Sequence, residues 1–151
     1  MSEPMCHSGA MEPVHGAGDA APSPFEPTEI LVDERREALR LTWADQHVSA
    51  LPYPYLRGFC PCAACQGHGG ALTFVEPPMP LSLNEVLEVG HYAINLVWQD
   101  GHRTGIYALD YLRSLCPCER CQRQMGTNHV LGRLPHKWCQ TLELSPLSKA
   151  P

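Results

Sequence analysis

Three cysteines lie within six residues of the chain, at Cys60, Cys62 and Cys65. Thiols this close together close a disulfide only with strain, because a disulfide demands a specific geometry of its own. Structural zinc takes four tetrahedral ligands from cysteine and histidine, and closely spaced cysteines with a distant partner are its usual sequence pattern. The three thiols therefore indicate a metal site whose fourth ligand comes from elsewhere in the chain.

The same hexad, Cys-Pro-Cys-x-x-Cys (CPCxxC), occurs again at residues 116–121, as part of a longer internal repeat. In both copies it is preceded by Trp-x-Asp-x-His and then Tyr-Leu-Arg, with Trp43 and Trp98 as the first residues. Three motifs in the same order indicate a duplication. Each copy contributes one histidine at the matching place, His47 and His102. Each of these is either a metal ligand, in its own half or across to the other, or only a polar residue that starts a strand.

The pattern predicts an α+β fold of two pseudo-symmetric halves, each a β-hairpin followed by a short helix and a cysteine knuckle. Alternating apolar residues predict the strands, and the Asp100-Gly101 pair predicts a two-residue hairpin turn. We expect Arg57 and Arg113 to bond to backbone carbonyls or to Asp45 and Asp100. The strands expected are 29–32, 38–43, 47–51, 73–75, 85–89, 91–98 and 102–107, and the helices 53–59 and 108–115.

At 151 residues the chain is long enough for one compact domain with tails. Residues 1–27 are rich in Pro, Gly and Ala and are predicted to be a disordered tail; residues 28–124 form the metal-binding domain, and 125–151 a partly ordered extension. The net charge of −5 argues against a nucleic-acid partner. Because the sequence shows neither a signal peptide nor a membrane-spanning apolar stretch, we expect a cytoplasmic protein with reduced thiols and no membrane contact.

Several of these motifs together resemble the N-terminal domain family of gamma-butyrobetaine hydroxylase, formerly a domain of unknown function, over about residues 28–115. The resemblance rests on the hexad at 60–65, on Tyr55-Leu56-Arg57, and on the segments 90–94 (GHYAI) and 98–102 (WQDGH). In that family the knuckle cysteines and the histidine of the second half bind one zinc ion. The resemblance thus implies zinc bound by Cys60, Cys62, Cys65 and His102, in a site that bridges the two halves.

The duplication suggests a second site that the resemblance does not supply. Its ligands would be Cys116, Cys118 and Cys121, with His47 reaching across from the first half. Cys139 is a rival fourth ligand, which would give a four-cysteine site. An unfilled second knuckle is the third possibility.

The function predicted from these residues is a structural zinc module that acts through protein–protein contacts. Four protein ligands leave no open position for substrate or water, and none of the eight histidines has an Asp or Glu two residues later, the local pair of an oxygenase iron site. No residues remain for an oxygenase domain, so we expect a freestanding module without enzymatic activity. Its protein partner is unknown; an oxygenase or a P-loop ATPase is the candidate.

The alternative keeps the cysteines and changes the metal. Similar domains are fused to P-loop ATPases that carry iron–sulfur clusters, so two CPCxxC knuckles could serve an accessory protein of iron–sulfur cluster assembly or transfer. A thiol oxidoreductase is less favoured, because its paired cysteines open a helix within a βαβ unit and the sequence shows no such unit.

Overall fold

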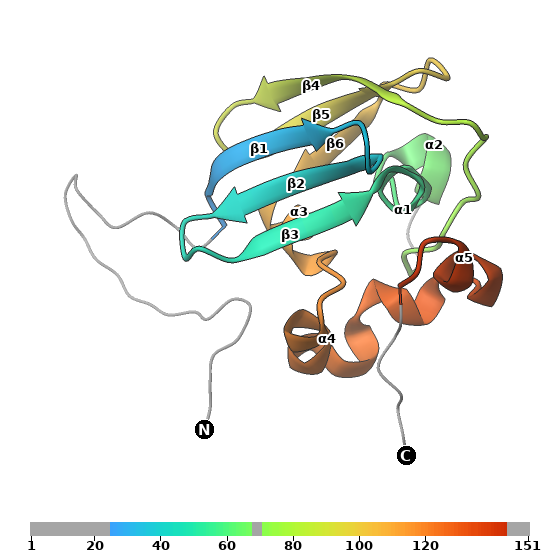
Figure 1. Cartoon of the computed structure of the whole chain (residues 1–151). Helices are drawn as coiled ribbons and strands as arrows, with labels where there is room; N and C mark the ends of the chain where they lie inside the picture. The colour runs from blue at the N-terminus through green and yellow to red at the C-terminus, as the bar shows by residue number, and fades with distance from the viewer. Residues whose placement is uncertain (1–24, 68–70, 145–151) are drawn as a thin grey trace.

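The computed structural model describes residues 25–67 and 71–144 and confirms the α+β class. Two antiparallel sheets of three strands each form its centre, in the orders β1-β2-β3 and β4-β5-β6 (Figure 1). Of the expected tail, residues 1–24 lie outside the described residues, and the first strand already begins at Pro27. The strands are β1 (Pro27–Asp33), β2 (Ala38–Trp43), β3 (Val48–Pro52), β4 (Leu83–Val89), β5 (Ala93–Trp98) and β6 (Gly105–Ala108).

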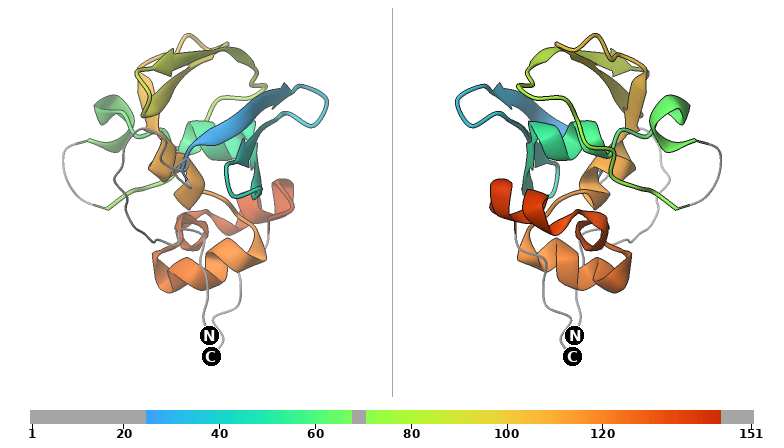
Figure 2. Two further views of the ribbon diagram at one scale, coloured as in Figure 1. Left: turned by 90° about the vertical axis from the view of Figure 1, so that its left-hand side faces the viewer. Right: turned by 90° about the vertical axis from the view of Figure 1, so that its right-hand side faces the viewer.

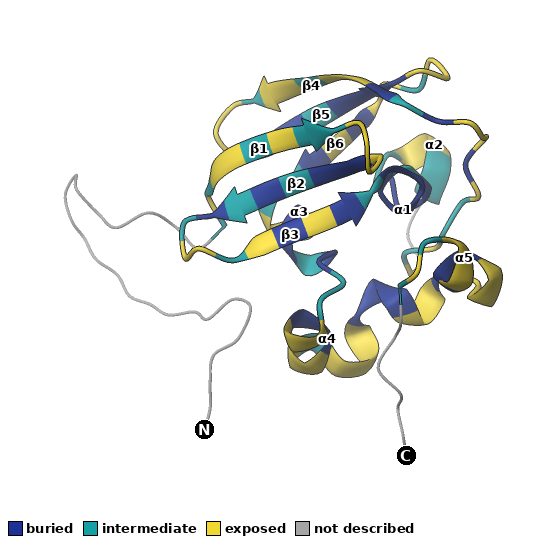
Figure 3. Ribbon diagram, viewed as in Figure 1, coloured by how far each residue is buried: buried dark blue, intermediate teal, exposed yellow. Residues whose placement is uncertain are grey.

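The middle strand of each sheet carries the core. Leu39, Leu41 and Trp43 alternate along β2 and are almost fully buried, as the period of two requires for one face of a strand. In β5, Leu96 and Trp98 are buried in the same way. The first strands, β1 and β4, are exposed over much of their length (Figure 3). Both tryptophans therefore anchor one common core.

A short helix and a cysteine knuckle follow the third strand of each sheet. Helix α1 (Tyr53–Gly58) starts directly after Pro52, and Pro54 occupies its first turn, where a missing N–H is tolerated. Helix α3 (Leu109–Ser114) has the same place in the second half. Figure 2 shows α1 and α3 in the middle of the molecule, below the two splayed sheets. The predicted order of elements is present, and the three strands expected around each hairpin pair into one three-stranded sheet per half.

Two local predictions are wrong. Residues 73–75 form no strand; the Val75 N–H bonds to the Gly58 carbonyl at 2.9 Å, and Phe74 is held by edge-on packing against Phe59. The two-residue turn is also absent, because the Gly101 N–H bonds to the Trp98 carbonyl and the Trp98 N–H to the His102 carbonyl, which closes a turn of three residues, 99–101. Only the glycine of the Asp100-Gly101 pair has a positive φ. The Asp100 carboxylate instead accepts the N–H of the residue two positions on, which stabilises a longer loop.

The segment after the second knuckle is more regular than its weak periodicity indicates. It forms α4 (Glu119–Met125), the single turns η1 (Gly126–Asn128) and η2 (Val130–Arg133), and α5 (His136–Thr141). These elements lie together below the sheets (Figure 1) and bury Leu131, Leu134 and Trp138 in the main core. The remaining helix, α2 (Ala63–Gln66), forms the end of the first knuckle.

Candidate metal centres

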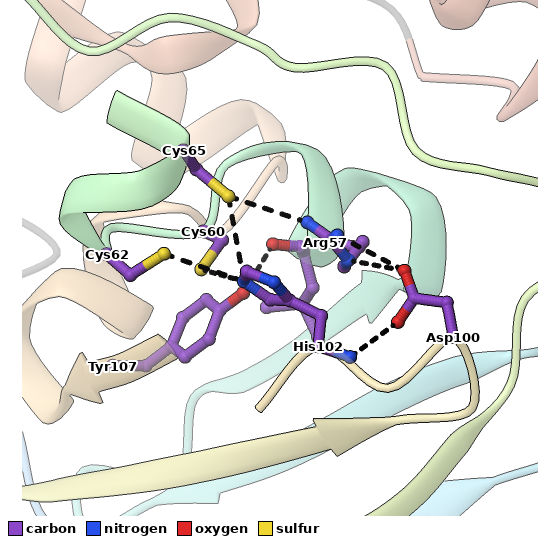
Figure 4. Close-up of polar contacts among 8 residues, drawn as sticks. Arg57, Cys60, Cys62, Cys65, Asp100, His102 and Tyr107 are labelled. Carbon is purple, nitrogen blue, oxygen red and sulfur yellow. Dashed lines mark hydrogen bonds and ion pairs between the residues drawn. The ribbon is translucent and has the colours of Figure 1, made fainter. Parts of the chain in front are cut away.

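The first knuckle and the histidine of the second half meet in space. The Nε2 atom of His102 lies 3.3 Å from Cys60 Sγ, 3.5 Å from Cys62 Sγ and 3.6 Å from Cys65 Sγ. All four potential ligand atoms lie within 4.8 Å of one another, and the three sulfurs surround the imidazole (Figure 4). The first group of predicted ligands is thus brought together across the two halves.

The second knuckle makes the same arrangement with the histidine of the first half. The Nε2 atom of His47 lies 3.3 Å from Cys116 Sγ, 3.8 Å from Cys118 Sγ and 3.5 Å from Cys121 Sγ. These four atoms also lie within 4.8 Å of one another. We call the group of Cys60, Cys62, Cys65 and His102 the first cluster, and that of Cys116, Cys118, Cys121 and His47 the second cluster.

An aspartate two residues earlier positions each histidine. The Asp45 carboxylate accepts the backbone N–H of His47 at 3.1 Å, and Asp100 accepts that of His102 at 3.0 Å. The same aspartates bind the arginine of the opposite half. Arg57 pairs with Asp100 at 3.2 Å, and Arg113 with Asp45 at 2.9 Å. Each loop that bears a histidine is therefore fastened to the helix that precedes the facing knuckle.

The two tyrosines of the repeated Tyr-Leu-Arg motif add a second reciprocal link. The Tyr55 hydroxyl donates to the carbonyl of Leu115, and the Tyr111 hydroxyl donates to the carbonyl of Phe59. Both acceptor carbonyls belong to the residue just before the first cysteine of a knuckle. Helix α1 thus orients the second knuckle, and helix α3 orients the first.

Burial and charge prepare both histidines to act as neutral ligands. Burial lowers the pKa of His47, and the nearby Arg113 guanidinium lowers it further. Burial likewise lowers the pKa of His102, assisted by Arg57. Since both imidazoles stay unprotonated at neutral pH, each keeps a lone pair available for a metal ion.

The thiols of each knuckle titrate very differently from one another. Burial raises the pKa of Cys60 to about 12. At Cys62 burial acts in the same direction, but hydrogen bonds led by that of Thr104 outweigh it and lower the pKa to about 7. In the second knuckle, the hydrogen bond from the Cys116 thiol lowers the pKa of Cys118 to about 5, and the pKa of Cys116 rises well above its usual value. Each knuckle therefore contains one cysteine that loses its proton more readily than the buried first cysteine does.

The spacing of the ligand atoms fits one tetrahedral ion in each cluster. Zinc bonds of about 2.3 Å to sulfur and 2.0 Å to nitrogen place the nitrogen and each sulfur of a tetrahedron about 3.5 Å apart. The observed nitrogen–sulfur distances are 3.3, 3.5 and 3.6 Å in the first cluster and 3.3, 3.8 and 3.5 Å in the second. Each cluster can therefore hold a metal ion.

Sequence reasoning missed one residue that supports the second cluster. His129 is buried, and its Nδ1 accepts the N–H of Leu131 at 3.1 Å, so its proton is on Nε2. That Nε2 lies 2.7 Å from the Cys116 carbonyl and donates to it. No histidine occupies the matching place in the first half, so the repeat gave no signal for it. Cys139 joins neither cluster; its thiol is directed at the carbonyl of Leu134, 3.9 Å away.

Fold and site together define a small duplicated domain with two cysteine/histidine clusters, and comparison with known proteins places it in a family. Residues 30–113 match the family described as gamma-butyrobetaine hydroxylase-like, N-terminal, and the chain belongs to this family. The resemblance seen in the sequence is thereby confirmed. No curated protein matches the chain.

Solved structures share the fold. A protein of unknown function of the DUF971 family from Acidithiobacillus ferrooxidans is 38% identical, with a TM-score of 0.50, over 60% of this chain and 91% of that one. A protein solved by NMR is 26% identical, with a TM-score of 0.52, over 80% and 89% of the two chains. A second NMR structure, 22% identical with a TM-score of 0.56 over 91% of this chain and 96% of that one, is alike in fold.

Within residues 25–67 and 71–144 we find no helix with the length and apolar character needed to cross a bilayer.

Proposed function

We propose that the protein is a structural zinc module in which one zinc ion in each cluster ties the two halves together. The observation that carries this proposal is the pair of ligand sets, each with three sulfurs around one imidazole nitrogen at the spacing of a single tetrahedral ion. Zinc bound in this way contributes on the order of 10 kcal/mol to folding in small domains. Because both ligand sets cross between the halves, that free energy holds the two sheets in one unit.

The spacing favours one ion over an iron–sulfur cluster in each site. In a four-iron cluster each thiolate binds a different iron, so the ligand atoms stand farther apart than those that share one ion. Here all four atoms of each set lie within 4.8 Å. The iron–sulfur alternative therefore requires both knuckles to open.

We infer that the module is not catalytic and acts through contacts with a protein partner. With three cysteines and a histidine bound, a tetrahedral zinc has no open position on which to activate water or polarise a substrate. The protein then provides a rigid surface to which a partner can bind. The family's description as the N-terminal domain of hydroxylase-like proteins makes an oxygenase the first partner to test, with a P-loop ATPase as the second.

Metal analysis of protein purified without oxygen tests the proposal. We expect about two zinc ions per chain, no iron or acid-labile sulfide, and no visible absorption. His102→Ala should bind one zinc ion fewer, while the matched control His91→Ala, at an exposed position outside both clusters, should keep two. A brown protein with stoichiometric iron and sulfide would overturn the proposal.

A further inference from the structure

The three sulfurs of the first cluster have different surroundings. Cys60 is 0% exposed, so a reagent reaches its sulfur only if the core opens. Cys62 and Cys65 are both partly exposed. These two differ in their neighbours, because a charged side chain bonds to one and an open hollow lies beside the other.

A fixed cation lies against Cys65. The guanidinium of Arg57 donates to Cys65 Sγ through Nη1 at 3.6 Å. The same guanidinium donates to the Asp100 carboxylate through Nε at 3.3 Å and through Nη2 at 3.2 Å (Figure 4). Because Asp100 holds it in place and its side chain is only 11% exposed, the positive charge stays beside the sulfur.

An open hollow of about 400 Å³ lies beside Cys62. Among the three cysteines of the first cluster, only Cys62 lines it, and within residues 25–67 and 71–144 no lysine or arginine side chain bonds to this sulfur. The remaining lining is mostly apolar and consists of Pro61, Ala63, Ala64, Thr104 and Ile106. Ile106 is 45% exposed, so the hollow offers apolar surface to an incoming molecule.

The bond from the cation affects how readily a bound sulfur attacks an electrophile. Zinc, when bound, keeps its ligand thiols deprotonated, and the thiolate is the nucleophilic form of cysteine. A cation beside such a sulfur creates no further thiolate; it only stabilises the negative charge, and a more stabilised thiolate is a weaker nucleophile. Arg57 therefore lowers the reactivity of Cys65, while Cys62 keeps its reactivity and has space for a reagent.

We propose that Cys62 is a modification site, at which a thiolate of the first cluster reacts with electron-poor alkenes whose apolar part occupies the hollow, while Arg57 protects Cys65. This inference rests on the proposed function, because it presupposes zinc in the first cluster. The Cys62 sulfur donates an electron pair to one alkene carbon, the π bond breaks, and the neighbouring carbon takes up a proton from water. The product is a thioether, and the addition consumes no oxidant or reductant.

Brief treatment of the zinc-loaded full-length protein with N-phenylmaleimide tests this. Fragmentation in the mass spectrometer assigns the label to single cysteines, and the zinc content is measured before the reagent is added. We expect Cys62 to be labelled first of the three, then Cys65, and Cys60 last. N-methylmaleimide carries the same alkene without the apolar ring, so the lead of Cys62 over Cys65 should be smaller with it. Labelling of Cys65 or Cys60 first, or an equal lead with both reagents, would overturn the inference.

Substitution of Arg57 tests the protection of Cys65. Arg57→Met removes the charge and should accelerate the labelling of Cys65 by about 3- to 10-fold without accelerating that of Cys62. Arg57→Lys keeps a positive charge and should restore most of the protection. The matched control is Arg36→Met, at an exposed arginine that pairs with Asp33 outside both clusters, and it should change neither rate.

The outcomes separate this inference from the proposed function. Equal acceleration at Cys62 and Cys65 in Arg57→Met would show a general loosening of the knuckle and would overturn the protective role of Arg57. If Arg57→Met loses its zinc, the labelling order in the wild-type protein and in Arg57→Lys still decides. A zinc content that is the same in the wild-type protein and in His102→Ala would instead overturn the proposed function, since the first cluster would then hold no zinc.

Discussion

The most decisive change to the protein framework is Tyr55→Phe, which removes one oxygen from a fully buried ring. The Tyr55 hydroxyl donates to the carbonyl of Leu115, at the entrance of the second knuckle. The side chain is 0% exposed, so water cannot replace the lost bond without opening the core. A buried acceptor left without its partner costs about 1–3 kcal/mol. We therefore expect the free energy of unfolding to fall by about 2 kcal/mol.

Tyr53→Phe is the matched control, since it makes the same chemical change two residues away. Tyr53 is 2% exposed, but its hydroxyl has no hydrogen-bond partner among residues 25–67 and 71–144. Removing a buried polar atom that makes no bond is neutral or stabilising. The two variants should therefore differ by about 2 kcal/mol although both substitute phenylalanine for a buried tyrosine.

Urea unfolding at a fixed free zinc concentration, followed by far-UV circular dichroism, measures the difference. With a slope of about 2 kcal/mol per molar urea, Tyr55→Phe should lower the midpoint by about 1 M and Tyr53→Phe should not lower it. An equal loss in both variants would refute the reasoning, because it would show that the ring contacts rather than the hydroxyl to carbonyl bond across the halves are responsible.

Three further predictions follow from contacts at the clusters. Gly105→Ala should remove the zinc of the first cluster only, because the new methyl group would lie 2.6 Å from a ligand sulfur. The control Gly132→Ala, which has nothing within 4 Å of its added Cβ, should keep two ions. Native mass spectrometry measures the number of ions bound by each variant. Burial lowers the pKa of His47 and His102, so the unfolded chain binds more protons than the folded one in weak acid. The free energy of unfolding of the metal-free protein should therefore fall as the pH drops below 6.5. A flat profile between pH 7 and 5 in urea titrations would contradict this. Cys139→Ala should leave the zinc content unchanged, since that thiol lies outside both clusters, and the loss of one equivalent would make Cys139 a ligand.

The repeat made much of the fold readable from the sequence. Two copies of one pattern predicted two similar halves, because each copy carries the same alternation ending in Trp43 or Trp98 and the same helix before its knuckle. The duplication alone did not say whether each histidine serves its own knuckle or the opposite one, since both choices have the same spacing. The resemblance to a family pointed to the crossed arrangement for His102, and the duplication then extended it to His47; both histidines lie in this arrangement in the structure.

What the sequence did not reveal depends on contacts between unlike segments. His129 supports the second knuckle from a single helical turn, too short to leave a periodic pattern, and has no counterpart in the other half. That Ser49 and Gly105 occupy the same place in the two sheets becomes visible only from the strand pairing. The wrong strand at 73–75 has the same cause, because there a packed Phe74 ring replaces a ladder of backbone bonds.

The central claim is that each cluster holds one zinc ion with three sulfurs and one nitrogen, the nitrogen coming from the opposite half. X-ray absorption at the zinc edge of the purified protein tests this most directly. We expect an average first shell of three sulfurs at about 2.3 Å and one nitrogen at about 2.0 Å, becoming richer in oxygen when His47 and His102 are both replaced by alanine. A shell of four sulfurs, or one of oxygen and nitrogen alone, would contradict the account.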